Sequence, residues 1–364
     1  MTGTGPASRF RAMLISMPWA LFNRPSLQLA ALKAYVEREM EAEILTRHPF
    51  LDVAAAIGID AYRRISASSW AGEALFAPLL FPGQRQKARD LFNSSLHRPA
   101  PGEKRLDFDE LVSRIAEACD DWLARNDLSG SRLIGFSVCF GQLLPSLHLS
   151  RRISENGLDA RIVFGGSSCC GDTGRALLRH FPWIDHVVDG EGEQALLGLC
   201  RYLAKNAAEM PARVLSRDSG PSPCPRHQSE GLDNLPTPDY RPYFAEIKTI
   251  FQELPFIPVL PVEFSRGCWW NKCTFCNLNL QWQGYRCKSA ERMISEVESL
   301  AREYQCLDFT FTDNALPVRQ ADRFFQRQRE LQQDRRFFAE IRAKCETRRL
   351  NDYARGGLRT IQVG

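Results

Sequence analysis

The chain has no long hydrophobic run, little net charge and no secretory signal pattern. No stretch approaches the roughly 18 to 20 apolar residues of a membrane span, because Pro18 and Arg24 interrupt the first apolar segment. A net charge of +4 over 364 residues gives no argument for nucleic-acid binding. Neither a membrane nor a nucleic acid is therefore expected as a partner.

Cysteine is the residue type in which the chain is rich, with twelve. A disulfide scaffold is not expected, since the cysteines are diluted in a long chain whose first eleven residues are small and polar. Hydrophobic content of 44% and charged content of 25% are typical of a globular protein long enough for two domains. A reducing, cytoplasmic location is the expectation.

Short apolar runs alternate with amphipathic helices over residues 12–203, which predicts a parallel α/β domain. We assign residues 1–206 to this Rossmann-like domain and expect an insertion at about 44–106, where no clean β-α repeat is found. Strands are expected at residues 12–18, 133–139, 161–164 and 186–189, and helices at 26–39, 108–125, 145–155 and 174–180.

Residues 207–257 contain eight prolines and are predicted to be a linker without regular elements. A second α/β unit, a partial β/α barrel, is expected over residues 258–364. Its strands are predicted at residues 262–265, 308–312, 338–342 and 360–363, and its helices at 290–304, 322–332 and 351–355.

Three cysteines lie close together in the second unit. Cys268, Cys273 and Cys276 follow the first predicted strand with the spacing Cys-x4-Cys-x2-Cys. Three thiolates can hold an iron–sulfur cluster and leave one iron open to a substrate or cofactor. A zinc site is the alternative, with Cys287 as the nearby candidate for a fourth ligand, and a coincidental spacing is the third possibility.

The sequence around these cysteines resembles a known family. The segments Arg-Gly-Cys-Trp-Trp, Cys-Thr-Phe-Cys-Asn-Leu-Asn and Tyr-Arg-Cys-Lys-Ser are similar to those of cobalamin-binding radical S-adenosylmethionine (SAM) proteins, and most similar to the branch that matures ribosomal peptides. The usual spacing in the superfamily is Cys-x3-Cys-x2-Cys, so this loop departs from it. The resemblance implies three cofactors: a 4Fe–4S cluster on Cys268, Cys273 and Cys276, SAM, and cobalamin.

The resemblance also implies positions for the two organic cofactors. Glu340, Arg342 and Lys344 alternate along a predicted strand and share one face, which is either the barrel interior or a solvated surface. A cobalt-ligating Asp-x-His-x-x-Gly motif is absent, so cobalamin is expected to bind without a histidine on cobalt. Residues implied near SAM are Phe275, Asp313, Asn314 and Glu340. Residues implied near cobalamin are Pro25, Ser26, Gly165, Gly166, Ser167, Ser168 and Glu191.

Other conspicuous residues are expected to be structural. Arg266, Trp269 and Trp270 are expected to shape the loop that carries the three cysteines. The remaining cysteines are interpreted as small core residues or as bystanders of the glycine segment. The core residues are Cys119, Cys139, Cys200, Cys306 and Cys345, and the bystanders are Cys169 and Cys170.

The stretch after Cys276 has room for about three βα units and the start of a fourth, fewer than a radical SAM barrel normally contains. The expectation is therefore a shortened barrel in a truncated or interrupted chain, and a compact half-barrel is the alternative.

The function implied by the resemblance is C-methylation of a ribosomal precursor peptide, driven by an electron donor. An inactive shortened copy, a radical SAM enzyme of another reaction type and a non-catalytic cobalamin- or metal-binding protein are the alternatives. No catalytic residue is assigned.

Overall fold

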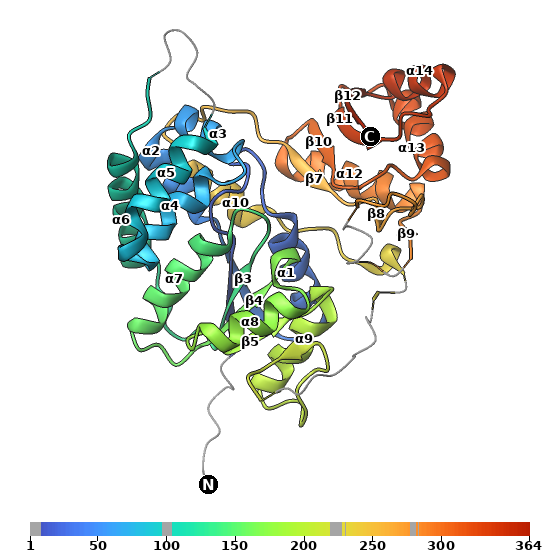
Figure 1. Ribbon diagram of the computed structural model, residues 1–364. Coiled ribbons are helices and arrows are strands. Elements are labelled where there is room, and N and C mark those ends of the chain that lie inside the picture. The colour runs from blue at the N-terminus through green and yellow to red at the C-terminus, as the bar shows by residue number, and fades with distance from the viewer. Residues whose placement is uncertain (1–8, 97–103, 219–227, 230, 277–281, 283) are drawn as a thin grey trace. The chain divides into compact units, whose positions relative to one another are not determined.

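The computed structural model describes residues 9–96, 104–218, 228–229, 231–276, 282 and 284–364 (Figure 1). These residues form two compact units. Unit 1 takes in the described residues of Met1–Phe22, Gln28–Pro225 and Pro242–Leu254. Unit 2 takes in those of Asn23–Leu27, Arg226–Arg241 and Pro255–Gly364.

Unit 1 is built on one sheet with the strand order β2-β1-β3-β4-β5-β6. All neighbouring pairs are parallel except β5 and β6, which are antiparallel. The strands are β1 Phe10–Ile15, β2 Ala42–Arg47, β3 Leu133–Ser137, β4 Arg161–Gly165, β5 His186–Val188 and β6 Val214–Leu215. The helices are α1 Leu27–Glu39, α2 Pro49–Ile57, α3 Ile59–Ser66, α4 Ala71–Leu80, α5 Arg85–Ser95, α6 Phe108–Arg125, α7 Leu143–Glu155, α8 Asp172–His180, α9 Gly192–Leu203 and α10 Arg241–Ile250, with short 3-10 turns η1 Pro82–Gln84 and η2 Ser167–Cys169.

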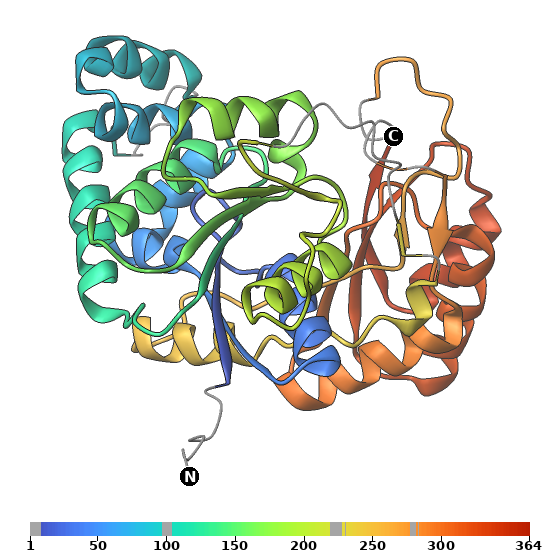
Figure 2. The same cartoon turned by 90° about the horizontal axis from the view of Figure 1, so that it is seen from below.

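Both faces of this sheet are buried, as expected for a parallel sheet. Met13 and Ile15 point into one core with side chains of α6, α7 and α8. Ala12 and Leu14, the alternating residues of β1, point into a second core with side chains of α1 and α9. Figure 2 shows helices on both sides of these strands. The predicted Rossmann-like α/β architecture is therefore present.

The predicted insertion begins later than expected. Ala42–Arg47 is not part of it, since it forms β2 and pairs in parallel with β1. The helices α2 to α5 follow, and Gly58, with a φ of +89°, separates α2 from α3. Trp19 packs against Tyr62 and Phe76 of these helices, with ring centroids 4.9 and 6.3 Å apart. The insertion thus supports the loop that follows β1.

The predicted linker contains regular structure. Helix α10 lies within it. Pro242 does not break this helix, because it occupies the first turn, where the backbone N–H has no partner within the helix. The hydroxyl of Tyr243 donates to the carbonyl oxygen of Phe22 (2.7 Å), and Glu246 accepts from the backbone N–H of His48 (3.0 Å). The helix is therefore part of unit 1, and the prediction of an irregular segment is wrong at this point.

Unit 2 contains a four-stranded parallel sheet of order β12-β11-β10-β7 and a two-stranded antiparallel ribbon of β8 and β9. The first predicted strand is divided: residues 260–262 join the sheet, and residues 265–266 form the ribbon. The strands are β7 Leu260–Val262, β8 Ser265–Arg266, β9 Arg286–Cys287, β10 Asp308–Phe311, β11 Arg336–Ile341 and β12 Leu358–Val363. The helices are α12 Ala290–Tyr304, α13 Val318–Leu331 and α14 Thr347–Arg355, with η3 Leu232–Asn234 before them.

Helices lie against this sheet (Figure 2), and the side chains packed between the sheet and α13 are aromatic. Phe311 and Phe337 stack with ring centroids 5.7 Å apart, and Phe324 and Phe325 of α13 pack edge-on against Phe337. Phe337 thus points toward the helices. The alternating residues of β11, including Glu340, therefore point to the opposite face of the sheet.

Candidate functional site

The three cysteines lie in a loop that follows β8, which we call the cysteine loop (residues 267–276). The loop begins at Gly267, whose φ is +83° and whose missing Cβ leaves room for the carbonyl oxygen of Gly284. Cys268 and Cys276 are half-buried and Cys273 is exposed. The backbone N–H of Cys276 donates to the carbonyl oxygen of Cys273 at 3.3 Å. The loop is thus anchored at its start and open to solvent at its tip.

The donor set of this loop fits an iron–sulfur cluster in its chemistry, since it offers three thiols within ten residues of the end of a strand. Among the residues that the structure describes, no group of three His, Cys, Asp or Glu side chains is arranged to hold a metal ion. The cysteine loop would therefore have to change shape to gather its thiols. Cys287, the alternative zinc ligand, lies on β9 opposite Ser265, and burial raises the pKa of its thiol.

Asp313 is the most buried of the residues expected near SAM. It follows β10, is 2% exposed, and accepts hydrogen bonds from the backbone N–H of Phe264 (3.1 Å) and from the hydroxyl of Ser265. Desolvation raises the pKa of its carboxyl to about 7, although both hydrogen bonds act in the other direction. Asp313 therefore joins the end of β10 to the segment that leads into the cysteine loop.

This burial predicts a pH-dependent stability. The carboxyl is protonated in the fold up to about pH 7 but ionises near 3.8 when exposed. The contribution of this carboxyl to the free energy of unfolding is therefore full below about pH 3.8 and is lost as the pH rises toward 7. Asparagine resembles the protonated acid, so Asp313→Asn should change the slope of unfolding free energy against pH by up to about 1.4 kcal/mol per pH unit between pH 4.5 and 6.5. Urea titrations over that range measure it, and identical slopes for variant and wild type would refute it.

Of the other residues expected near SAM, Asn314 adjoins Asp313, whereas Glu340 and Phe275 lie on other segments of unit 2. Asn314 is half-buried. Burial raises the pKa of Glu340, which lies on the open face of β11. Phe275 is 91% exposed at the tip of the cysteine loop. The structure therefore places these residues near the carboxyl ends of neighbouring strands without packing them together.

Arg266 does not lie over the tryptophans that follow Cys268. Its guanidinium binds both carboxylate oxygens of Glu263, at 2.8 and 2.9 Å, and lies 5.9 Å from the ring of Trp282. Both partners lie outside the cysteine loop, so the expectation that Arg266 shapes this loop stays a prediction.

In unit 1 the carboxyl ends of β1 and β3 form the point where strand order reverses, the usual ligand position in such sheets. Gln142, which sequence reasoning missed, is buried there. Its side-chain N–H groups donate to the carbonyl oxygen of Met17 (2.5 Å) and to Ser16 Oγ (3.3 Å). Its carbonyl oxygen accepts from the backbone N–H of Cys139 (3.0 Å). Gln142 thus ties together the loops after β1 and β3.

The predicted glycine segment follows β4. A Cβ on Gly166, whose φ is +103°, would lie 2.6 Å from the carbonyl oxygen of Val138, and the N–H of Ser168 donates to the same oxygen at 3.1 Å. Gly166 therefore permits a close approach of two loops at the carboxyl edge. Gly165, half-buried, ends β4, and Ser167 is exposed at the start of η2.

The remaining residues expected near cobalamin are dispersed. Glu191 is half-buried at the start of α9. Pro25 and Ser26 belong to the part of the chain assigned to unit 2, so the structure does not group them with the glycine segment. Cys169, expected to be a bystander, and Cys139, expected to be a core residue, are near that segment, and burial raises the pKa of both thiols.

Glu73 is a second residue that sequence reasoning missed. This carboxylate of α4 accepts from the backbone N–H groups of Leu143 (3.0 Å) and Leu144 (2.9 Å) at the start of α7. Burial raises its pKa. The insertion therefore fixes the helix that follows β3 as well as the loop that follows β1.

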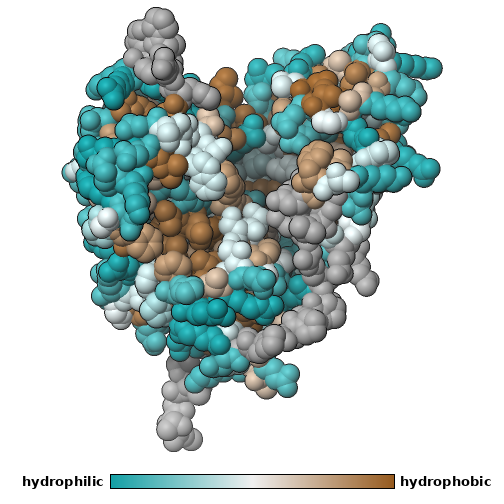
Figure 3. Space-filling view, viewed as in Figure 1, coloured by the Kyte–Doolittle hydropathy of each residue, from teal (hydrophilic) through white to brown (hydrophobic). Residues whose placement is uncertain are grey.

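Apolar side chains reach the surface of unit 1, as the brown areas over it in Figure 3 show. Two belong to the same region of the fold: Phe140, in the loop after β3, is 67% exposed and packs edge-on against Trp70, which is 53% exposed, with ring centroids 5.7 Å apart. The carboxyl edge of the sheet thus carries an exposed aromatic pair.

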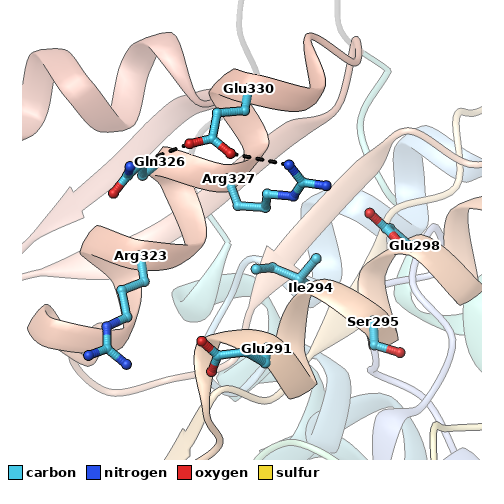
Figure 4. A pocket seen from close by; sticks show the side chains of 8 residues that line it. All are labelled: Glu291, Ile294, Ser295, Glu298, Arg323, Gln326, Arg327 and Glu330. Carbon is cyan, nitrogen blue, oxygen red and sulfur yellow. Dashed lines mark hydrogen bonds and ion pairs between the residues drawn. The ribbon is translucent and has the colours of Figure 1, made fainter.

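An open groove lies between α12 and α13 of unit 2 (Figure 4). Its lining is mostly charged, and Glu330 interacts within it with Arg327 (3.2 Å) and Gln326 (3.4 Å). No residue predicted to bind a cofactor lines it, so we do not assign it to the site.

Comparison with known proteins gives partial matches. No known family model matches the chain. It is 30% identical over 145 residues to the anaerobic magnesium-protoporphyrin IX monomethyl ester cyclase of Cereibacter sphaeroides, which is 38% of this chain and 23% of that protein. It is 33% identical over 177 residues to an uncharacterized methyltransferase of Pyrococcus horikoshii, or 47% of this chain and 36% of that protein.

Solved structures share the fold over nearly the whole chain. The cobalamin-dependent SAM radical enzyme OxsB, with aqua-cobalamin and SAM bound, matches 98% of this chain and 44% of its own, with a TM-score of 0.62 and 18% identity. The radical SAM methyltransferase TsrM of Kitasatospora setae matches 97% of this chain and 59% of its own, with a TM-score of 0.53 and 16% identity. The predicted α/β fold is therefore confirmed. This chain spans only part of the length of each of these proteins.

Among the residues that the structure describes, no helix has the length and apolar character needed to cross a membrane.

Proposed function

We propose that the chain binds a 4Fe–4S cluster, SAM and cobalamin, and that it is a radical SAM C-methyltransferase. The observation that carries this proposal is the combination of an OxsB-like fold over 98% of the chain with three thiols in the loop after β8. When bound, the three groups together supply radical generation and a transferable methyl group, and the protein supplies binding and orientation.

The residues of unit 2 have distinct proposed roles. Cys268, Cys273 and Cys276 hold the cluster, and Phe275 contacts SAM from the same loop. Asp313 keeps the entry to the loop joined to β10. Asn314 and Glu340 offer polar groups to SAM near the ends of β10 and β11.

The carboxyl edge of unit 1 is the proposed cobalamin site, with Gly165, Gly166, Ser167, Ser168 and Glu191 around it. The sequence resemblance assigns Pro25 and Ser26 to the same cofactor. No histidine of the described part of unit 1 is suited to bind cobalt from this edge. His148 lies within α7, with burial lowering its pKa to about 4, and His186 is at the amino end of β5. His180 ends α8, and His48, which follows β2, is 3% exposed with its Nδ1 held 3.0 Å from a carboxylate oxygen of Glu246. Cobalamin without a histidine ligand is therefore the form we propose.

The substrate we propose is a ribosomal precursor peptide, methylated at carbon in the cytoplasm with the help of an electron donor. The support is the resemblance of the segments around the cysteines to enzymes of that class. Relatives named as a cyclase and as a methyltransferase make a different radical SAM reaction the second candidate.

The test is an anaerobic assay of the reconstituted protein with SAM, methylcobalamin, a reductant and a precursor peptide encoded beside its gene. We expect deoxyadenosine and a peptide heavier by one methyl group, both read by mass spectrometry. Deoxyadenosine without methylation would favour another reaction type. Cobalamin binding without deoxyadenosine would favour a non-catalytic binding protein.

A further inference from the structure

Three side chains from two distant segments stack in unit 2. The guanidinium carbon of Arg342, just past β11, lies 3.4 Å from the centroid of the Trp270 ring and 5.6 Å from that of Trp269. The two indoles meet edge to face at 6.4 Å. Because Trp269 and Trp270 directly follow Cys268, this stack lies next to the first thiol of the cysteine loop.

The stack is fastened to the sheet at both of its ends. The indole N–H of Trp269 donates to the carbonyl oxygen of Leu316 (3.3 Å), and the backbone N–H of Leu316 donates to the carbonyl oxygen of Glu340 (3.0 Å). On the other side of Arg342, the N–H of Ala343 donates to the carbonyl oxygen of Gly364 (3.1 Å). Arg342 is therefore held on a backbone fixed by its neighbours.

The rest of the cysteine loop has few contacts of this kind. Residues 271–275 are exposed, and Lys272 is placed with its ammonium nitrogen 5.0 Å from the Trp270 ring. Nη1 of Arg342 is buried without a hydrogen-bond partner in the described structure. The guanidinium thus contacts the loop through its flat face, a contact that a lysine cannot reproduce.

We propose that Arg342 is a positioning residue for the cysteine loop: it stacks on Trp270, fixes Cys268 against the carboxyl ends of the strands, and leaves the tip free to bring Cys273 and Cys276 to the metal. Its role toward the metal rests on the proposed function. Its role in ordering the loop does not.

The first test uses the metal-free protein and endoproteinase Lys-C. Lys272 itself is exposed, but the protease must also draw the preceding residues into an extended strand, which requires Trp270 to leave Arg342. Arg342→Gln and Trp270→Leu should therefore each speed the appearance of the fragment that ends at Lys272, followed by mass spectrometry, about three- to tenfold, the range expected for a lost cation–indole contact. The rate of cleavage after Lys272 in Arg342→Lys should be closer to that of Arg342→Gln than to that of wild type. The matched control Arg355→Gln changes an exposed arginine of α14 and should cleave at the wild-type rate.

The second test measures iron release. After anaerobic reconstitution, iron should pass to a chelator about three- to tenfold faster from Arg342→Gln than from wild type or Arg355→Gln. The double variant Arg342→Gln with Trp270→Leu should release iron no faster than either single variant, because both remove one contact.

These outcomes separate the two claims. If no variant and no wild type takes up iron, the proposed function fails while the Lys-C rates still decide the role of Arg342. Wild-type cleavage rates in both Arg342→Gln and Trp270→Leu would overturn that role. Should Arg342→Gln unfold, as judged by circular dichroism, Trp270→Leu and Arg342→Lys decide it.

Discussion

Replacing Cys268 by alanine is expected to reduce the iron of the anaerobically reconstituted protein from about four atoms per chain to less than about one, because two thiolates from one loop do not retain a 4Fe–4S cluster. Deoxyadenosine release should fall with it to background. Iron and sulfide determination with the visible spectrum measures the first effect, and chromatography of the nucleoside measures the second. Cys273→Ala and Cys276→Ala should behave in the same way.

Two other cysteines provide the controls for this experiment. Cys345→Ala changes a half-buried thiol outside the loop and should keep full iron content. Cys287→Ala distinguishes the two metal sites that the sequence leaves open. A cluster on three thiols should survive this change, whereas a zinc site with Cys287 as fourth ligand should lose its metal. Normal iron content in Cys268→Ala would contradict the assignment.

Replacing Glu296 by alanine is expected to lower the unfolding free energy of unit 2 by about 3 to 5 kcal/mol. Glu296 is fully buried in α12, and its carboxylate binds Lys288 Nζ at 2.8 and 2.9 Å and Arg292 at 3.0 Å. Its removal leaves the ammonium of Lys288, itself only 3% exposed, without a counter-charge. Urea unfolding followed by tryptophan fluorescence measures the change.

A neighbouring glutamate and a compensating variant complete this prediction. Glu298→Ala, on the groove side of the same helix, should change the unfolding free energy by about 0.5 kcal/mol or less. Changing Lys288→Met together with Glu296→Leu should recover most of the loss, since apolar pairs of similar volume replace buried ion pairs well. A loss below about 1 kcal/mol in Glu296→Ala would show that this pair does not stabilise the unit.

Much of the fold could be predicted from the sequence because hydrophobic periodicity is a local signal. The helices at Phe108–Arg125 and Ala290–Tyr304 have the predicted bounds, since each has a capping residue and a clear apolar face. Two elements were not predicted, each for a different reason. Ala42–Arg47 was absorbed into the insertion, and α10 was dismissed because Pro242 was counted as a helix breaker although it occupies the first turn.

The site could be predicted only in part. The cysteines are adjacent in sequence, so their spacing is informative without a structure. Gln142 and Glu73 bind backbone groups that are 125 and 70 residues away in the sequence. No local sequence pattern predicts so distant a partner. The alternation of Glu340 and Arg342 predicted a shared face, but the packing of Phe324 and Phe325 on Phe337 was needed to show that this face points away from the helices.

The most direct test of the central claim is electron paramagnetic resonance of the reduced, anaerobically reconstituted protein before and after SAM is added. Three thiolates leave one iron open, so the signal of a reduced 4Fe–4S cluster should change on addition of SAM, and Arg355→Gln should show the same change. A protein that binds only zinc, or a cluster signal that SAM leaves unaltered, would contradict the account.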